Sequence, residues 1–350
     1  MVRSRSFIAT PPGATIKEQL KDRGMSQKEF AARMDMSEKH ISKLINGDVK
    51  LTPEVAVRLE MVLGVPAKFW NSLEAVYREK LIKVAAENAM DEDEALAKQL
   101  PYSEMMKYGW VPEARTSKEK VIYLRKYFEV VELSLLENNQ ITRIACRRLA
   151  VTKKSDFALL AWAQEAKLKA RNIETLPINI KELIGIIPDI RRMTVLNPKE
   201  FCPKLKKMLS ECGIALVFLP HLKGSFLQGA SFVDGNKIVV GLTARGKDAD
   251  KFWFSLFHEL AHIILGHIGQ ANGTSEQDEK DADLWARDTL IPINLFEKFK
   301  SKRMYSADNV CKFADSLGIA AGIVVGRLQN ENCIKYSTLN DLKEHYNIVV

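Results

Sequence analysis

The residues best suited to chemistry lie in the segment His258-Glu259-Leu260-Ala261-His262. If this segment is helical, His258 and His262 lie one turn apart on one face, so both imidazoles can reach the same metal ion. Glu259 then lies close to the same edge, where its carboxylate can accept a proton from a water molecule at the metal. This spacing predicts a metal-dependent hydrolytic site, with zinc as the metal that the geometry favours.

The residues around this segment decide how much weight the motif carries. The flanking positions are uncharged, which favours a buried helix over residues 251–267 that ends at Gly266; they are Ser255, Leu256, Phe257, Leu260, Ala261, Ile263 and Ile264. A buried helix whose histidines only hydrogen-bond their neighbours is the alternative reading.

A hydrolytic zinc site needs a third protein ligand beside the two histidines. In metzincins the third ligand is a His six residues after the second His, but here that position, 268, is Ile. His267 is one residue out of this register, so we expect a surface role for His267. A second predicted helix, residues 276–292, places Glu279 and Asp283 near its apolar stripe. We assign Glu279 as the third ligand and Asp283 as the acceptor for the N–H of a ligating imidazole. The alternative is a solvated acidic helix start.

These two helices resemble a known family. The pattern FWFSLFHELAH, followed by E-x-x-A-D-x-W-A and then LIP, is similar to the ImmA/IrrE family of zinc metallo-endopeptidases, in which Phe is usual where Trp285 stands. The resemblance covers about residues 179–327. It implies a gluzincin-type zincin fold, one Zn²⁺ per chain with Glu279 as a ligand, and proteolysis of a regulatory protein, often a helix-turn-helix repressor.

Residues 11–85 predict a helix-turn-helix unit. Ser26 is expected to cap a short helix in a capping box with Glu29, and Ser37 to cap a second helix that ends at Gly47. Apolar residues on both helices can lock them together; they are Phe30, Ala31, Met34, Ile41, Leu44 and Ile45. An ordinary antiparallel helix pair is the alternative.

In a helix-turn-helix, the start of the second helix enters the major groove of double-stranded DNA. Lys39 and Lys43 can then contact guanine or phosphate, and Glu38 can accept from cytosine or exclude other bases. The expected operator contacts from this region are Gln27, Ser37, Glu38, Lys39, His40, Ser42 and Lys43.

This N-terminal segment also resembles a family. The stretches PPGATIKEQLKDRGMSQKEFAARM and SEKHISKLINGDVKLTPEVAVRLEMVLGVPAKFWNSLEAVYRE, in about residues 11–80, are similar to Xre or Cro-like proteins and, among them, to HigA-type antitoxins. The resemblance implies binding to operator DNA as a homodimer and, in an antitoxin, neutralisation of a cognate toxin. Two half-sites one helical turn apart also favour a homodimer.

Bulk composition fits a soluble globular protein of several domains. The 350 residues are 46% hydrophobic and 27% charged, with a net charge of +8 that only hints at an anionic partner. No apolar run approaches a membrane span and the N-terminus lacks a signal-peptide core, so we expect a cytoplasmic protein without a membrane partner. The five cysteines predict reduced, mostly buried thiols. The charge run at residues 91–94 predicts a solvated linker or a helix start.

We expect a mainly α-helical chain with a small α+β unit. The predicted order is a helix-turn-helix domain (residues 1–85), a helical connector (86–175), a zincin-like core with a small sheet (176–300) and a C-terminal helical appendage (301–350). Asp234-Gly235 between two apolar runs predicts a β-hairpin in the core, whose sheet edge could hold an extended peptide. Arg245 and Arg287 are candidate oxyanion helpers, although surface salt bridges are the more frequent role of such residues.

Two functions remain open at this point. In the first, the protein is a DNA-bound regulator that is also a zinc endopeptidase, and it cleaves a repressor or an antitoxin. In the second, it is a HigA-like antitoxin and autorepressor whose zincin domain senses or binds a partner without cleavage. The general base Glu259 favours the first, because a pure binding module needs no such group.

Overall fold

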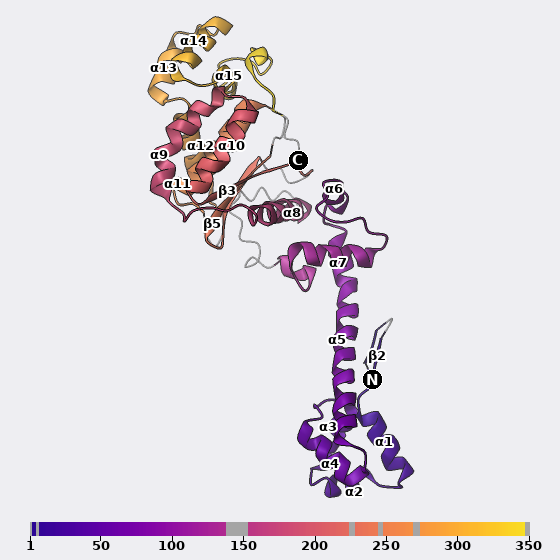
Figure 1. The fold of residues 1–350 in the computed structure, drawn as a ribbon. Helices are drawn as coiled ribbons and strands as arrows, with labels where there is room; N and C mark the ends of the chain where they lie inside the picture. The colour runs from indigo at the N-terminus through magenta and orange to yellow at the C-terminus, as the bar shows by residue number, and fades with distance from the viewer. Residues whose placement is uncertain are drawn as a thin grey trace. The chain divides into compact units, whose positions relative to one another are not determined.

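The computed structural model describes residues 2–4, 7–137, 153–223, 228–243, 248–268 and 274–346. The chain divides into two compact units, Met1–Ala95 and Leu96–Val350 (Figure 1). The fold is mainly helical with one small three-stranded sheet in the second unit, as the sequence predicts.

The first unit is a helix-turn-helix domain. A short hairpin precedes five helices, which are β1 (Val2–Arg3), β2 (Ile8–Ala9), α1 (Gly13–Asp22), α2 (Gln27–Arg33), α3 (Glu38–Asn46), α4 (Pro53–Leu63) and α5 (Ala67–Ala97). Ser26 caps α2 and Ser37 caps α3, each accepting a hydrogen bond from a backbone N–H three residues on. Gly47 ends α3 with a φ of 82°, a backbone conformation that favours glycine.

Two details of this unit differ from the sequence-based expectations. The capping box of α2 is only half formed, because the Glu29 carboxylate accepts hydrogen bonds from Arg33 one turn later rather than returning to Ser26. Asp91–Glu94 is not a helix start, because it lies inside α5, which continues to Ala97. Asp93 is buried, so this run is not a uniformly solvated face.

The second unit places its sheet between helices. Its helices up to the sheet are α6 (Tyr102–Lys107), α7 (Ser117–Phe128), α8 (Lys153–Ala170), α9 (Ile180–Arg192) and α10 (Pro198–Glu211). The strands are β3 (Ile214–Leu219), β4 (Gly229–Asp234) and β5 (Lys237–Thr243), in the order β3-β5-β4. β3 runs parallel to β5, whereas β4 and β5 form the expected antiparallel hairpin across Gly235-Asn236.

Alternation along β5 assigns one layer of helices to each face of the sheet. Trp162 of α8 is fully buried against Gly241, where an added Cβ would lie 2.6 Å from the indole. Val240 and Leu242 point to the opposite face, into the hydrophobic core that contains α11 (Ala249–Ile264). Since α8 lies within residues 86–175, a helix of the expected connector packs against this sheet.

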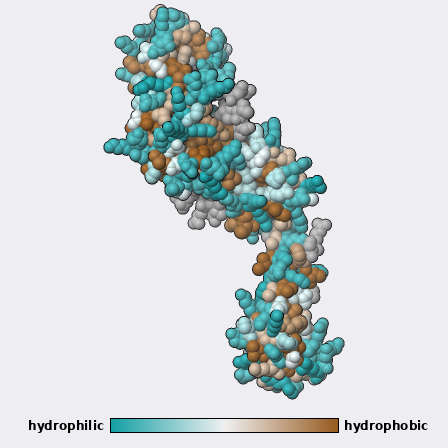
Figure 2. All heavy atoms as spheres, viewed as in Figure 1, coloured by the Kyte–Doolittle hydropathy of each residue, from teal (hydrophilic) through white to brown (hydrophobic). Residues whose placement is uncertain are grey.

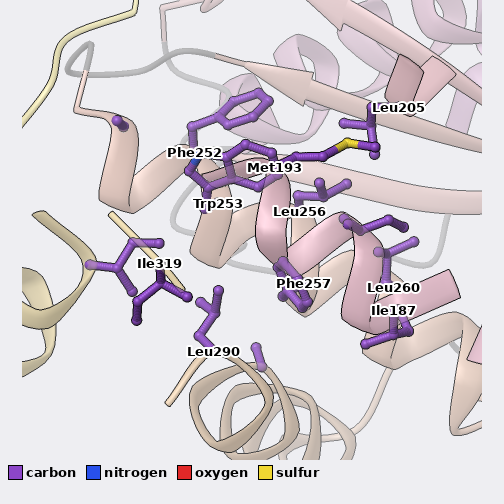
Figure 3. Packing of buried hydrophobic residues seen from close by; sticks show 14 of the residues in the cluster. Ile187, Met193, Leu205, Phe252, Trp253, Leu256, Phe257, Leu260, Leu290 and Ile319 are labelled. Carbon is purple, nitrogen blue, oxygen red and sulfur yellow. The ribbon is translucent and has the colours of Figure 1, made fainter. Parts of the chain in front are cut away.

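The core of the second unit is centred on α11. Figure 3 shows apolar side chains along this helix packed with residues from preceding and following elements. The remaining helices are α12 (Glu276–Leu290), α13 (Ile293–Ser301), α14 (Ala307–Leu317) and α15 (Ala321–Asn330). α15 packs against α11, and the Trp253 indole N–H donates to the Tyr346 hydroxyl at 3.0 Å. The C-terminal helices therefore complete the core around α11.

Two further expectations can be compared with the structure. Among the described cysteines only Cys212 is buried, whereas Cys202, Cys311 and Cys333 are partly exposed, so the expectation of mostly buried thiols is wrong. Cys146 lies outside the described residues. In the described part of the chain no single helix is long and apolar enough to cross a membrane; α14 and α15 meet that test only as a pair, with a bend of 113° between them.

Candidate metal centre

Helix α11 carries the two histidines on a largely buried surface. Its apolar residues face the core over four turns, and Gly266, with a φ of 75°, turns the chain just after the helix ends. His262 is buried and His258 is partly exposed. The helix therefore presents one imidazole deep in the unit and one nearer the surface.

Helix α12 carries the expected third ligand. Ser275 and Asp278 form a capping box at its start, so the first turn is fixed. Ala282 and Ala286 are fully buried, and these small side chains let α12 pack closely against α11. Glu279, in the first turn of α12, is buried as well.

The structure brings His258, His262 and Glu279 together. The two Nε2 atoms are 3.0 Å apart, and the Glu279 carboxylate oxygens lie 3.5 Å from His258 Nε2 and 3.6 Å from His262 Nε2. One donor atom from each residue lies within 4.8 Å of the other two. Two imidazole nitrogens and one carboxylate oxygen are a ligand set that suits zinc.

Each of these three side chains has a second partner that orients it. Asp283 Oδ1 lies 2.8 Å from His258 Nδ1, and the Thr274 hydroxyl donates to Glu279 Oε1 at 2.6 Å. His262 Nδ1 lies 3.1 Å from His267 Nδ1. Such partners fix the ring orientation of a ligating histidine.

Two of these partners, His267 and Thr274, were not predicted from the sequence. The expected surface role of His267 is wrong, because His267 is buried against His262. The signal was Gly266, since a left-handed residue directly after a helix folds the next residue back over the last turn. Thr274 precedes the N-cap Ser275, and nothing in the local sequence pattern indicated its contact with Glu279.

Glu259 lies beside the ligands on the inner side of α11. It is only 5% exposed, and its Oε2 atom is buried without a hydrogen-bond partner among the described residues. Burial raises the pKa of Glu259 to about 7, although the charge of His258 and the Ser231 hydroxyl act in the opposite direction. Gly229 of β4 makes room for this side chain, because an added Cβ would lie 2.9 Å from Glu259 Cγ and Oε1.

The acidic residues give the cluster an affinity for positive charge. Burial by itself lowers the pKa of His258, but hydrogen bonds to Asp283 and Glu279 and the charge of Glu259 raise it to about 10. Burial lowers the pKa of His262 to about 4, with the neighbouring His258 acting in the same direction. Burial raises the pKa of Glu279, yet hydrogen bonds from His258 and Thr274 outweigh it and the pKa is lowered. Without a metal ion, the raised pKa of His258 favours the protonated form of this ring at neutral pH.

Two other polar residues of α12, Asp281 and Arg287, hydrogen-bond to residues outside the ligand set. Asp281 accepts a hydrogen bond from Gln277 on its own helix. Arg287 donates to Asp288 at 2.8 Å, which is the salt-bridging role that the sequence favoured over oxyanion stabilisation. Arg245 lies outside the described residues.

The residues expected to contact DNA lie together on the first unit. Gln27 begins α2, Ser37 caps α3, and the others follow on α3, whose opposite face is buried by Ile41, Leu44 and Ile45. All seven keep solvent-accessible surface; they are Gln27, Ser37, Glu38, Lys39, His40, Ser42 and Lys43. The Ser37 side chain accepts from the backbone N–H of His40 at 3.2 Å, which leaves its hydroxyl proton free to donate.

Comparison with known proteins agrees with both halves of this description. Residues 16–70 match the helix-turn-helix family model, and residues 213–329 match the model of the IrrE N-terminal-like domain, a peptidase M78 family. An uncharacterized HTH-type transcriptional regulator, YddM of Escherichia coli (strain K12), is 36% identical over 63 residues, which is 67% of that protein and 18% of this chain. The chain belongs to the helix-turn-helix regulators. In it, a helix-turn-helix domain is joined to an IrrE N-terminal-like domain of the ImmA/IrrE type.

Proposed function

We propose that this DNA-binding regulator is also a zinc-dependent endopeptidase that cleaves a regulatory protein, either a repressor or an antitoxin. The observation that carries the proposal is the convergence of His258 Nε2, His262 Nε2 and the Glu279 carboxylate within 4.8 Å, beside the buried Glu259. A site that only bound a metal ion would need the three ligands but no buried base next to them.

The chain's own residues fit a zinc ion. Two imidazoles and one carboxylate are the protein ligands of many catalytic zinc sites, and Asp283 fixes His258 so that Nε2 faces the other ligands. When bound, zinc polarises the scissile carbonyl and lowers the pKa of a water molecule. We assign one Zn²⁺ per chain to these ligands.

Glu259 is assigned as the general base. Without a metal ion its pKa is about 7, and the ionised carboxylate can take a proton from the attacking water and then deliver it to the leaving amine. Its Oε2 atom accepts no hydrogen bond from a described residue, so it can accept this proton. Burial between α11 and β4 holds the carboxylate in place.

The edge of the sheet supplies a place for the substrate backbone. β4 pairs with β5 on one side, and among the described strands no partner covers its other side. Its residue Gly229 lies against Glu259, so a peptide that added to β4 as a strand would pass close to the base. Such binding requires an extended segment, so the substrate is a protein with a locally unfolded stretch.

The helix-turn-helix domain implies DNA binding, and we propose that its operator contacts come from the start of α3 together with Gln27. Lys39 and Lys43 lie one turn apart on the exposed face of α3 and can contact guanine or phosphate. Glu38 at the same end limits which bases fit.

A homodimer would suit this domain. Several hydrophobic residues of the first unit are exposed, among them Met61 at 79%, Val57 at 45% and Phe69 at 44%. Figure 2 shows hydrophobic residues interspersed with hydrophilic ones over the visible face of this unit. Self-association on such residues would place two recognition helices for two half-sites.

Metal analysis and a cleavage assay test the protease. Purified protein should contain about one zinc per chain, and His262→Ala should lose it because a ligand is missing. Glu259→Gln should keep the zinc and lower the cleavage of the natural protein partner by at least ~100-fold. Asp281→Asn, a change of the same chemical kind on α12, should leave both unchanged. Full zinc in His262→Ala would refute the ligand assignment, and undiminished cleavage by Glu259→Gln would remove this residue from the reaction.

Operator binding tests the DNA surface separately. Lys39→Ala combined with Lys43→Ala should weaken binding and reduce its salt dependence by about two counterions. Lys68→Ala with Lys80→Ala removes the same charge from α5 and serves as the control. Equal loss in both double variants would show that net charge, rather than the start of α3, controls the affinity.

A further inference from the structure

His267 lies directly behind the metal ligand His262. The chain turns at Gly266, and the backbone N–H of His267 donates to the carbonyl of His262 at 2.8 Å. The two rings are 5.3 Å apart between centroids, and their Nδ1 atoms are 3.1 Å apart. The His267 side chain is only 10% exposed, so this contact forms inside the unit.

The arrangement allows a single assignment of protons when a metal ion is bound. His262 Nε2 faces His258 and Glu279 and must be unprotonated to bind a metal ion, so the proton of the neutral ring is on Nδ1. That N–H points at His267 Nδ1, which must therefore accept. The proton of His267 is then on Nε2, which lies 3.5 Å from Asp278 Oδ1.

Asp278 is held firmly for this role. Its Oδ2 atom accepts from the backbone N–H of Ser275 at 2.8 Å and from the Ser275 hydroxyl at 2.7 Å. Asp278 also precedes Glu279 in the chain. The ligand His262, the neutral ring of His267 and the carboxylate of Asp278 thus connect the end of α11 to the start of α12.

We propose that His267 is a positioning residue of the metal site. Its Nδ1 atom accepts a hydrogen bond from the Nδ1–H of His262, and its Nε2–H faces Asp278 Oδ1. The inference rests on the proposed function only as far as His258, His262 and Glu279 bind a metal ion; it does not depend on proteolysis. By fixing the tautomer and orientation of His262, His267 increases the affinity of the site for zinc.

The two ligating histidines differ in the residue that contacts their Nδ1 atom. His258 is partly exposed and contacts Asp283 directly, whose side chain is 54% exposed. His262 is 3% exposed and contacts the neutral ring of His267, which needs less hydration than a carboxylate would. A neutral imidazole can be buried at lower cost, and it moves the negative charge out to Asp278, whose side chain is 18% exposed.

The tautomer of His267 gives the first test, on the unmodified protein. In the zinc-loaded full chain labelled with ¹⁵N, long-range ¹H–¹⁵N spectra should show His267 as a neutral ring with its proton on Nε2, and His262 with its proton on Nδ1. A proton on Nδ1 of His267 in that sample would overturn the proposal. This measurement stands whether or not a variant folds.

Two substitutions separate the hydrogen bond from packing. His267→Phe keeps a buried ring without a nitrogen and should weaken zinc binding by about 10- to 100-fold in competition with a chromophoric chelator. His267→Asn offers an amide oxygen near the Nδ1 position and should stay within about threefold of the parent chain. His345→Phe, at a residue whose side chain is 65% exposed, should not change the affinity.

The outcomes separate this inference from the proposed function. Parent-like affinity in His267→Phe, or equal loss in His267→Phe and His267→Asn with thermal unfolding unchanged, would refute the positioning role. A parent chain that binds no zinc would instead refute the metal site itself. A parent chain that binds zinc but cleaves no partner would leave the positioning of His262 intact.

Discussion

Proton release on zinc binding offers a quantitative check of the electrostatics of the site. Without a metal ion, hydrogen bonds to Asp283 and Glu279 raise the pKa of His258 to about 10 against the opposing effect of burial. At pH 8.5 this ring is therefore about 97% protonated, whereas Glu259, whose pKa is about 7, is ionised. His262, with its pKa lowered to about 4, is neutral. A zinc ion that takes the place of the His258 proton releases it to the buffer.

The informative perturbation is Asp283→Asn. Removal of an opposite charge in contact with a histidine lowers its pKa by about 1 to 3 units, so His258 would be between about 75% and 3% protonated at pH 8.5. The variant should therefore release about 0.2 to 0.9 fewer protons per zinc than the parent chain. Protons from any water at the site are common to both proteins and cancel in the difference.

Calorimetry in buffers of different ionisation enthalpy measures this number directly. Asp281→Asn is the matched control, because Asp281 is on the same helix and is hydrogen-bonded to Gln277 rather than to a ligand. Equal proton release from the parent chain and Asp283→Asn would show that Asp283 does not hold the proton on His258. A similar decrease in Asp281→Asn would attribute the effect to the general charge of α12.

Two further predictions concern glycines on the sheet. Gly229→Ala would bring a methyl group to 2.9 Å from Glu259 Cγ and Oε1 and to 3.0 Å from Leu242 Cδ2, so the carboxylate must shift. Cleavage of the partner should fall by about 10- to 100-fold with zinc content unchanged. Loss of zinc would show that the ligands had moved instead. Gly241→Ala would press on the buried indole of Trp162 and should lower the free energy of unfolding in urea by about 1–3 kcal/mol, whereas Gly185→Ala, with open space around it in α9, should cost nothing; equal stability of the two variants would contradict the packing of α8 on the sheet.

Local spacing in the sequence was enough to identify helices and turns in both units of the chain. The interval from His258 to His262 is one helical turn, and the caps Ser26 and Ser37 mark helix starts that the structure reproduces. The hairpin at Gly235 followed from turn chemistry. These features depend on residues within a few positions of one another, so the sequence carries them directly.

Contacts between distant segments were decided by the tertiary structure. Asp91–Glu94 lies inside the long helix α5, whereas the local pattern assigned this charge run to a linker or a helix start. The packing of Trp162 against Gly241 joins residues 79 positions apart, and periodicity indicates an apolar face without its partner.

The metal centre combines both kinds of information. The sequence determined which residues could serve as ligands, because two imidazoles one helical turn apart can reach the same metal ion. Only the fold decided that the start of α12 lies against α11, with buried Ala282 and Ala286 between them, and that brought Glu279 to the histidines. His267 faces inward because the chain turns at Gly266, and its ring meets Asp278 because α12 packs against α11.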